Sequence, residues 1–303
     1  MIAHLAVALM LAAAPLPARA DLPLPGTNGM KYREKAGDPV RLSAYGLGTK
    51  RVYLRTGATF APQKNLSEVS VAPGGRLTAG VPAAYRSGHD TLVLTDRTTG
   101  ATAAIRTVRK PLTASHVSWT RDSRRVALTV ERKVSGRWRV LGFTVVDVAA
   151  KTARTVRISG LSAEAAFWWS PDGNLVSRHG TGLRVYRPTD GAVLRTYAGT
   201  GLPTGPEESF SPSGRRLATW CPPRVKQHLC LVDPATGKIV RRVAVRPQAL
   251  FGWWDESHVI AVMAHRGAYR VSVLDLNGKV TRVLTALPAR TRAAGLWLSF
   301  SKV

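Results

Sequence analysis

A set of polar side chains recurs a few residues before large apolar residues in this sequence, and these side chains could bind a cation or do acid–base chemistry. Carboxylates can hold a cationic group, and two of them close together can act as general acid and general base. The set consists of Glu68, His116, Glu164, Glu207, Glu208 and Gln248. Solvated strand starts that tolerate polar residues would give the same pattern. Glu207 and Glu208 are poorly placed as a pair, because neighbours along a strand point to opposite faces.

Arginine recurs at a fixed distance after the same apolar residues. The residues concerned are Arg76, Arg124, Arg125, Arg215 and Arg216. A guanidinium can bind a phosphate or a carboxylate through two parallel hydrogen bonds, so the series predicts an anion-binding rim. Basic residues are also common after turns of this kind in repeat proteins, and that habit alone would produce the series.

The motifs of common enzyme classes are absent from the sequence. It contains no Gly-x-Ser-x-Gly, no His-Glu-x-x-His, no phosphate-binding loop and no Gly-x-Gly-x-x-Gly. The seven histidines lack the spacing of metal ligands. We therefore assign no catalytic residue, no metal site and no cofactor from the sequence.

The two cysteines, Cys221 and Cys230, lie between two apolar stretches. If those stretches are antiparallel neighbours, the thiols lie nearly opposite each other and can form a disulfide, which would contribute about 2–3 kcal/mol. Two free thiols are the alternative. A metal site is not expected, because a second pair of ligands is missing.

The N-terminus has the layout of an export signal. Residues 2–14 form a short apolar block, and Ala18, Arg19 and Ala20 follow as a small-x-small cleavage site. This layout predicts a signal peptide over residues 1–20 and an extended segment over residues 21–38. A buried N-terminal helix is the alternative, since the block is not preceded by lysine or arginine. No run of about 20 apolar residues occurs, so no transmembrane segment is expected.

A repeat positions these residues along the rest of the chain. Each copy has an apolar anchor, a four-residue turn and a short apolar strand. The anchors are Val71, Trp119, Trp169, Phe210 and Trp253. Each copy then closes with a second hairpin, which in most copies ends at Asp and a Gly-bearing turn. A period of roughly 40–50 residues fits four short strands, which is the length of a β-propeller blade.

Two incomplete copies lie at the ends of the repeat region. Residues 51–57 have no anchor of their own, and residues 296–301 form an anchor strand without hairpins. The C-terminal strand would become the innermost strand of a blade whose other strands come from about residues 39–66. Such pairing removes the exposed edge of an open array. The sequence thus predicts an all-β, six-bladed propeller over residues 39–303, closed by its two ends.

Two of the turns resemble those of a known repeat family. Residues 170–173 (Ser-Pro-Asp-Gly) and 211–214 (Ser-Pro-Ser-Gly), each followed by an apolar strand, are similar to the PD40 (WD40-like) repeat of TolB-like propellers. The resemblance covers about residues 39–303. It implies the fold, and it carries over none of the partners of that family.

Most tryptophans lie close to an anchor, where packing between blades requires large apolar side chains. Stacking of sugars or bases on these rings is the alternative. Trp138 and Trp220 lie away from the anchors and are better binding candidates.

The composition limits the class of protein and of partner. The chain has 303 residues, 45% of them hydrophobic, and a net charge of +26, which excludes global disorder and suits anionic partners. We expect a secreted, non-enzymatic binding or protein-interaction module at the cell envelope, monomeric, whose partner is a protein or an anionic envelope polymer. A channel-active lyase or hydrolase, using acidic residues at the channel mouth, is the alternative. Nucleic acid is a distant option, because the sequence has no reading motif.

Overall fold

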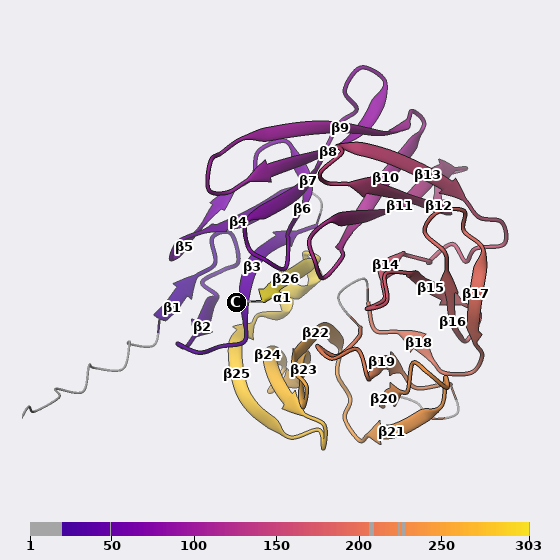
Figure 1. Cartoon of the computed structure of the whole chain (residues 1–303). Coiled ribbons are helices and arrows are strands. Elements are labelled where there is room, and N and C mark those ends of the chain that lie inside the picture. Colours follow the sequence, from indigo (N-terminus) through magenta and orange to yellow (C-terminus); the bar gives the residue numbers. More distant parts are fainter. Residues whose placement is uncertain (1–19, 49, 206–208, 224, 226–227, 303) are drawn as a thin grey trace, which may run out of the picture.

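Six four-stranded antiparallel sheets follow one another around a ring in the computed structural model of the protein (Figure 1). The structure describes residues 20–48, 50–205, 209–223, 225 and 228–302. From the innermost strand outward, the first sheet consists of β26 (Leu296–Lys302), β3 (Val40–Leu47), β4 (Arg51–Thr56) and β5 (Thr59–Pro62). The second consists of β6 (Leu66–Val71), β7 (Leu77–Pro82), β8 (His89–Asp96) and β9 (Thr102–Arg109). The third consists of β10 (Leu112–Trp119), β11 (Arg125–Val134), β12 (Arg137–Asp147) and β13 (Thr152–Arg157). The fourth consists of β14 (Trp168–Trp169), β15 (Leu175–His179), β16 (Gly182–Tyr186) and β17 (Val193–Tyr197). The fifth consists of β18 (Leu202–Pro203), β19 (Leu217–Trp220), β20 (Leu229–Val232) and β21 (Ile239–Val243). The sixth consists of β22 (Ala249–Asp255), β23 (His258–His265), β24 (Ala268–Asp275) and β25 (Val280–Leu287). The predicted all-β, six-bladed propeller is confirmed.

Local turn chemistry makes each repeat fold into a blade. In the turn after β14, the amide of Gly173 donates to the carbonyl of Ser170 at 3.0 Å, and Gly173 has a φ of +77°, which glycine adopts without strain. Most predicted anchors end or lie in innermost strands, as Val71 does in β6 and Trp119 in β10. Phe210 differs, because it forms only an isolated bridge to Leu217 beside the short β18.

The C-terminal strand closes the ring, as the sequence predicts. β26 pairs antiparallel with β3, from Leu296 opposite Leu47 to Lys302 opposite Val40. The indole of Trp297 lies across Gly46, where an added Cβ would come within 2.4 Å of the ring. Only glycine therefore fits beneath this tryptophan at the seam.

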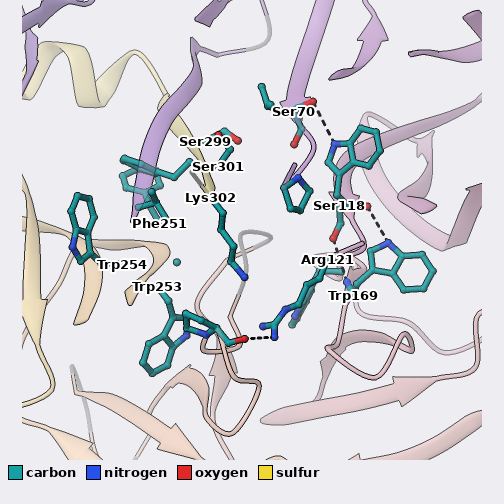
Figure 2. Close-up of a pocket in the computed structure, with 18 of the residues that line it drawn as sticks. Ser70, Ser118, Arg121, Trp169, Phe251, Trp253, Trp254, Ser299, Ser301 and Lys302 are labelled. Carbon is teal, nitrogen blue, oxygen red and sulfur yellow. Dashed lines mark hydrogen bonds between the residues drawn. The ribbon is translucent and has the colours of Figure 1, made fainter. Parts of the chain in front are cut away.

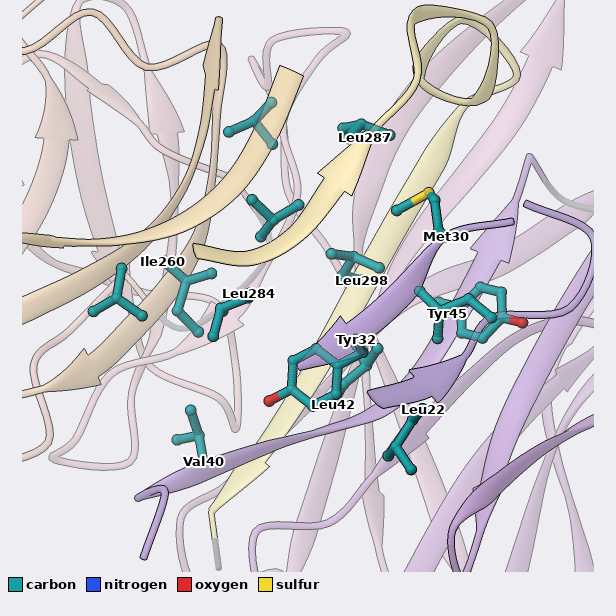
Figure 3. Close-up of a cluster of buried hydrophobic side chains, with 14 of the residues drawn as sticks. Leu22, Met30, Tyr32, Val40, Leu42, Tyr45, Ile260, Leu284, Leu287 and Leu298 are labelled. Atoms are coloured by element: carbon teal, nitrogen blue, oxygen red, sulfur yellow. The ribbon is translucent and has the colours of Figure 1, made fainter. Parts of the chain in front are cut away.

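The segment before the propeller packs into this seam. Residues of the predicted extended segment 21–38 include a two-stranded hairpin, β1 (Ala20–Pro23) with β2 (Lys31–Glu34). Its buried side chains join the hydrophobic cluster of the first and last blades (Figure 3), which includes Leu22, Met30, Tyr32, Leu42, Tyr45, Ile260, Leu284, Leu287 and Leu298. A short helix, α1 (Ala289–Ala293), precedes β26. Within the described residues, no helix has the length and apolar content to cross a membrane.

The alternating strand directions divide the turns between two ends of the disc. The turns between first and second strands, and between third and fourth strands, lie where the innermost strands end; we call this the cavity end. The turns between second and third strands lie at the opposite end, together with the links from one blade to the next; we call this the connection end. Hydrogen bonds agree with this division: Gly74 donates to Ser123 between neighbouring first turns, and Lys110 donates to Gly88 between a link and a hairpin turn.

Cys221 and Cys230 form a disulfide across the β19–β20 hairpin at the connection end, with the two Cα atoms 5.0 Å apart. The disulfide prediction is confirmed.

Candidate functional site

A cavity of about 430 Å³ lies at the centre of the ring, at the cavity end. The ends of five innermost strands line it, and the sixth blade contributes Pro212 from its first turn. The lining combines aromatic rings with hydroxyl groups (Figure 2). It includes Ser70, Ser118, Trp119, Trp168, Trp169, Phe251, Trp253, Trp254, Ser299, Phe300 and Ser301.

Three of the tryptophans of this lining are held by the neighbouring blade. The indole N–H of Trp169 donates to the carbonyl of Ser118 at 3.1 Å, and that of Trp253 donates to the carbonyl of Ser209 at 2.9 Å. Trp119 makes a longer bond of the same kind to Ser70, at 3.4 Å. Each of these three rings thus packs between blades and joins them through a hydrogen bond, which agrees with the packing role expected from the sequence.

Two basic side chains reach the cavity. The guanidinium of Arg121 extends from the β10–β11 turn to another blade, where it donates to the carbonyls of Pro212 at 2.6 Å and Ser211 at 2.7 Å. Lys302, near the end of β26, points its ammonium group into the cavity toward Arg121 (Figure 2). Among the described residues, Lys302 has no ion pair. The sequence reasoning named neither residue.

The acidic residues of the lining, Asp255 and Glu256, are occupied by turn structure. The carboxylate of Glu256 accepts hydrogen bonds from the amide and hydroxyl of Ser213 in the next blade. Burial disfavours ionisation of Asp255, but hydrogen bonds from Ser257 and His258 outweigh it and lower the pKa of Asp255 below its ordinary value. Neither carboxylate pairs with Lys302.

The residues predicted at the channel mouth are only partly brought together. Glu68 accepts hydrogen bonds from the backbone amides of His116 at 2.8 Å and Val117 at 2.6 Å. These amides belong to a bulge in β10, where His116 has a φ of +58°. Because the bulge takes two successive amides out of the ladder, the Glu68 carboxylate supplies their acceptors. Neither Glu68 nor His116 lines the cavity.

The other predicted mouth residues have separate partners. Glu164 is exposed and pairs with Arg178, and Gln248 accepts from Arg292 at 3.3 Å. Glu207 and Glu208 lie outside the described residues. Ligand binding by this set remains a prediction. No group of three or more histidine, cysteine or acidic residues that could hold a metal ion occurs in the part of the chain that the structure describes.

The predicted rim arginines follow the first turns and have different surroundings. Arg76 pairs with Asp96 at 2.7 Å, and their hydrogen bond lowers the pKa of that carboxyl below its ordinary value. Arg125 lies over the Trp169 ring, and Arg216 donates to the carbonyl of Glu256.

The remaining two rim arginines are exposed. Arg124 is 3.9 Å from Asp122, an ion pair between exposed groups that contributes little, and no contact of the Arg215 guanidinium is seen in the described residues. Anion binding at this rim also remains a prediction.

Comparison with known proteins identifies the fold. No protein-family model matches the sequence, and no match is found among curated proteins. Among solved structures, TolB from Acinetobacter baumannii is similar, with a TM-score of 0.54 and 16% identity over 88% of this chain. The chain spans 66% of the length of that protein.

Two further structures have the same degree of similarity. An oligogalacturonate lyase in complex with manganese has a TM-score of 0.53 and 12% identity, over 88% of this chain and 83% of the lyase. The β-propeller domain of the trilobed protease from Pyrococcus furiosus has a TM-score of 0.53 and 12% identity, over 77% of this chain and 74% of the domain. At such identities these similarities establish a TolB-like propeller fold and no activity.

Proposed function

We propose that the protein is an exported, non-enzymatic binding module of the cell envelope, which takes an acidic group of its partner into the central cavity. The observation that carries this proposal is the Lys302 ammonium, which points into an aromatic, hydroxyl-lined cavity without a carboxylate partner among the described residues. A partly buried cation of this kind is stabilised by a bound anion, because a charge-assisted hydrogen bond is stronger where water is excluded.

The surroundings of the cavity support an acidic partner. The carboxylates of Asp255 and Glu256, which lie in the same lining, are occupied by turns. The exposed guanidiniums of Arg124 and Arg215 lie around the same end of the disc, where they would speed the approach of an acidic partner.

Export agrees with the chemistry of the chain. The apolar block and cleavage site of residues 1–20 have the layout of a signal peptide. The disulfide between Cys221 and Cys230 fits an oxidising compartment. A propeller with a TolB-like fold also fits the envelope.

The alternative is a lyase or hydrolase active in the channel. The similarity in fold to an oligogalacturonate lyase is the reason to consider this alternative. It needs two ionisable groups that converge on one substrate. Both carboxylate oxygens of Glu68 bind backbone amides, and Glu164 pairs with Arg178, so both residues have structural contacts that suffice to explain them.

The test uses fluorescein-labelled tetrapeptides that combine an acidic and an aromatic residue, with lysine-containing peptides as a charge control. We expect fluorescence polarisation to show binding of the acidic peptides, and Lys302→Gln to weaken it by about 10- to 100-fold, the effect of one charge-assisted hydrogen bond. The matched variant Arg215→Gln, outside the cavity, should change it by no more than about twofold. Equal binding of acidic and lysine peptides, or an unaffected Lys302→Gln, would overturn the proposal.

A further inference from the structure

Eight aspartates of the propeller lie at the cavity end, where they build turns. Each of the following accepts a hydrogen bond from a backbone amide of its own turn: Asp96, Asp122, Asp147, Asp172, Asp190, Asp233, Asp255 and Asp275. The turns of the connection end that the structure describes are built without aspartate. Cations at the connection end therefore have no such series of turn carboxylates beside them.

A continuous line of exposed cations crosses two blades at the connection end. Backbone contacts establish its continuity: the amide of Lys110 donates to the carbonyl of Gly88 at 3.0 Å, and Leu112 pairs with Arg132. Arg132 in turn pairs with Arg139 on the next strand. We call this line the basic track, and it consists of Arg86, Arg109, Lys110, Arg132, Arg137 and Arg139, all of which are exposed.

The β11–β12 hairpin places like charges opposite each other in this track. Arg132 and Arg139 are direct cross-strand partners, so their Cβ atoms are about 5 Å apart, and Arg137 projects from the same face of the hairpin. None of the six track residues has an ion pair within the described residues. Directly opposed like charges destabilise a sheet, and a bound anion between the two guanidiniums would remove that cost.

The acidic groups nearest the basic track make hydrogen bonds to other residues. Glu131 precedes Arg132 and projects from the opposite face of the strand, where its carboxylate accepts from the Ser115 hydroxyl at 3.0 Å. Asp90 is buried and accepts from the amides of Thr91 and Ala114. The track therefore keeps its positive charge.

The exposed aromatic ring of the β11–β12 hairpin lies on its other face. Trp138 is 48% exposed, but it lies between Arg137 and Arg139 along the strand, so its ring projects away from the track, on the face of Val140. The other large hydrophobic side chains that are exposed in the described part of the chain are on the outermost strands: Val193, Leu194, Val240 and Val280. The connection end therefore exposes too little apolar surface for insertion into a bilayer.

We propose that the basic track binds a linear polymer with a phosphodiester backbone. A line of separate cations suits a chain with regularly spaced charges better than it suits one small ion. The non-bridging oxygens of a phosphodiester can be shared by guanidiniums from two strands, whereas a planar carboxylate is matched by a single guanidinium fork. This surface lies at the other end of the disc from the cavity and does not depend on the cavity proposal.

The experiment measures fluorescence polarisation of labelled poly(glycerol phosphate) and of single-stranded DNA with the same number of phosphates, using the full chain. Polyglutamate of equal charge tests the preference for phosphate, and phosphatidylglycerol vesicles test a membrane surface. We expect both phosphodiester polymers to bind with strong salt dependence. Tighter binding of DNA than of poly(glycerol phosphate) would identify nucleic acid as the source of the backbone, and equal or weaker binding of DNA would identify an envelope polymer.

The variants locate the site. Arg132→Gln with Arg139→Gln should weaken binding about tenfold or more and reduce the slope of log affinity against log salt by about 1.4, which corresponds to two lost phosphate contacts. Trp138→Ala alters the opposite face of the same hairpin and should leave binding within about twofold of the wild type. The control double variant, Lys238→Gln with Lys279→Gln, removes equal charge from exposed turns at the cavity end, and Lys302→Gln tests the cavity itself; both should bind as the wild type does.

Three results would overturn the proposal. The first is an equal loss of affinity in the control double variant, which would mean diffuse attraction. The second is equally tight binding of polyglutamate. The third is binding to vesicles while both soluble phosphodiester polymers fail to bind. Because Lys302 is untouched in the track variants, failure here is distinguishable from failure of the cavity proposal.

Discussion

The two ends of the disc use their charged residues in different ways. At the cavity end, aspartates close the turns and neighbouring turns contact each other, as Ser213 and Glu256 do. At the connection end, the turns that the structure describes are built without aspartate, and Arg132 and Arg139 lie opposite each other with no ion pair among the described residues. Few carboxylates are available in this chain, so their use in turns determines where positive charge remains.

This difference separates structural requirements from binding capacity. A carboxylate that receives backbone amides in a turn is fixed in place and is hard to replace without loss of stability. An exposed arginine with no partner contributes little to stability and is free to bind an anion. Substitutions of the turn aspartates should therefore affect folding first, and substitutions of the exposed track arginines should affect binding first.

The largest expected contrast is between two tryptophans. Trp253 is 7% exposed at the cavity end and Trp138 is 48% exposed at the connection end. Trp253→Ala should reduce the free energy of unfolding by about 3–5 kcal/mol, because it leaves a cavity and removes one of the two hydrogen bonds that the carbonyl of Ser209 accepts. Trp138→Ala should change it by no more than about 0.5 kcal/mol. Urea unfolding followed by circular dichroism measures both.

A conservative variant separates the two causes at Trp253. Trp253→Phe keeps most of the ring and loses the indole N–H, so the expected loss is only about 0.5–1.5 kcal/mol, for one hydrogen bond, because the Ser209 carbonyl still accepts from the amide of Ala218. Equal destabilisation by Trp138→Ala and Trp253→Ala would contradict the distinction between a ring that joins blades at the cavity end and an exposed ring at the connection end.

The disulfide is the exception that sharpens the comparison, since it is a stabilising element at the connection end. Replacing both Cys221 and Cys230 with alanine should lower the free energy of unfolding by about 2–3 kcal/mol, because the unfolded chain gains freedom in the released loop. Reduction of the wild-type protein should have a similar effect, and reductant should leave the alanine variant unchanged. If the alanine variant had the same free energy of unfolding as the oxidised wild type, the disulfide would not stabilise the hairpin.

A smaller effect is expected for a single turn aspartate. Asp172 accepts hydrogen bonds from the Ser170 hydroxyl and from the Asn174 amide group, and Asp172→Ala should cost about 1 kcal/mol at neutral pH. Burial opposes ionisation of Asp172, but these bonds outweigh it and lower its pKa below the ordinary value. A lowered pKa in the folded state stabilises the protein above the unfolded pKa, and this stability is lost as the pH falls through the folded value.

Thermal melting between pH 2 and pH 7 tests this sign. The difference between wild type and Asp172→Ala should be full above about pH 5 and should shrink toward pH 2, when the wild-type carboxyl is protonated. Asp172→Asn retains an oxygen that can accept the Ser170 hydroxyl and should lose less. A gap that widens on acidification would contradict the assignment.

The sequence predicted the blades well because turn chemistry is local. Turns such as residues 170–173 carry their own hydrogen-bonding groups, so their strands can be recognised without knowledge of the rest of the chain. The closure by residues 296–301 followed from the same repeat. Lys302 could have been found by the same reasoning, since it immediately follows the strand predicted to be innermost.

Other features depend on contacts that a sequence does not display. Arg121 reaches carbonyls in another blade, and no pattern near residue 121 signals that contact. Glu68 binds a bulge in β10 whose position depends on strand register. The repeat also draws attention to arginines that follow turns, whereas the unpaired track is recognised only when the partners of every arginine are known.

The smallest expected effect is on stability at the basic track itself. Arg132→Gln with Arg139→Gln removes two like charges from directly opposed positions, so without ligand it should raise the free energy of unfolding by about 0.2–1 kcal/mol. The gain should diminish as salt screens the repulsion, and it should disappear when poly(glycerol phosphate) is added, because the wild type alone is then stabilised by the bound anion. Val193→Thr, on an outermost strand away from the track, serves as a control without salt dependence. A variant that is less stable than the wild type at low salt would mean that the two guanidiniums stabilise the hairpin, and the argument for an anion between them would lose its energetic basis.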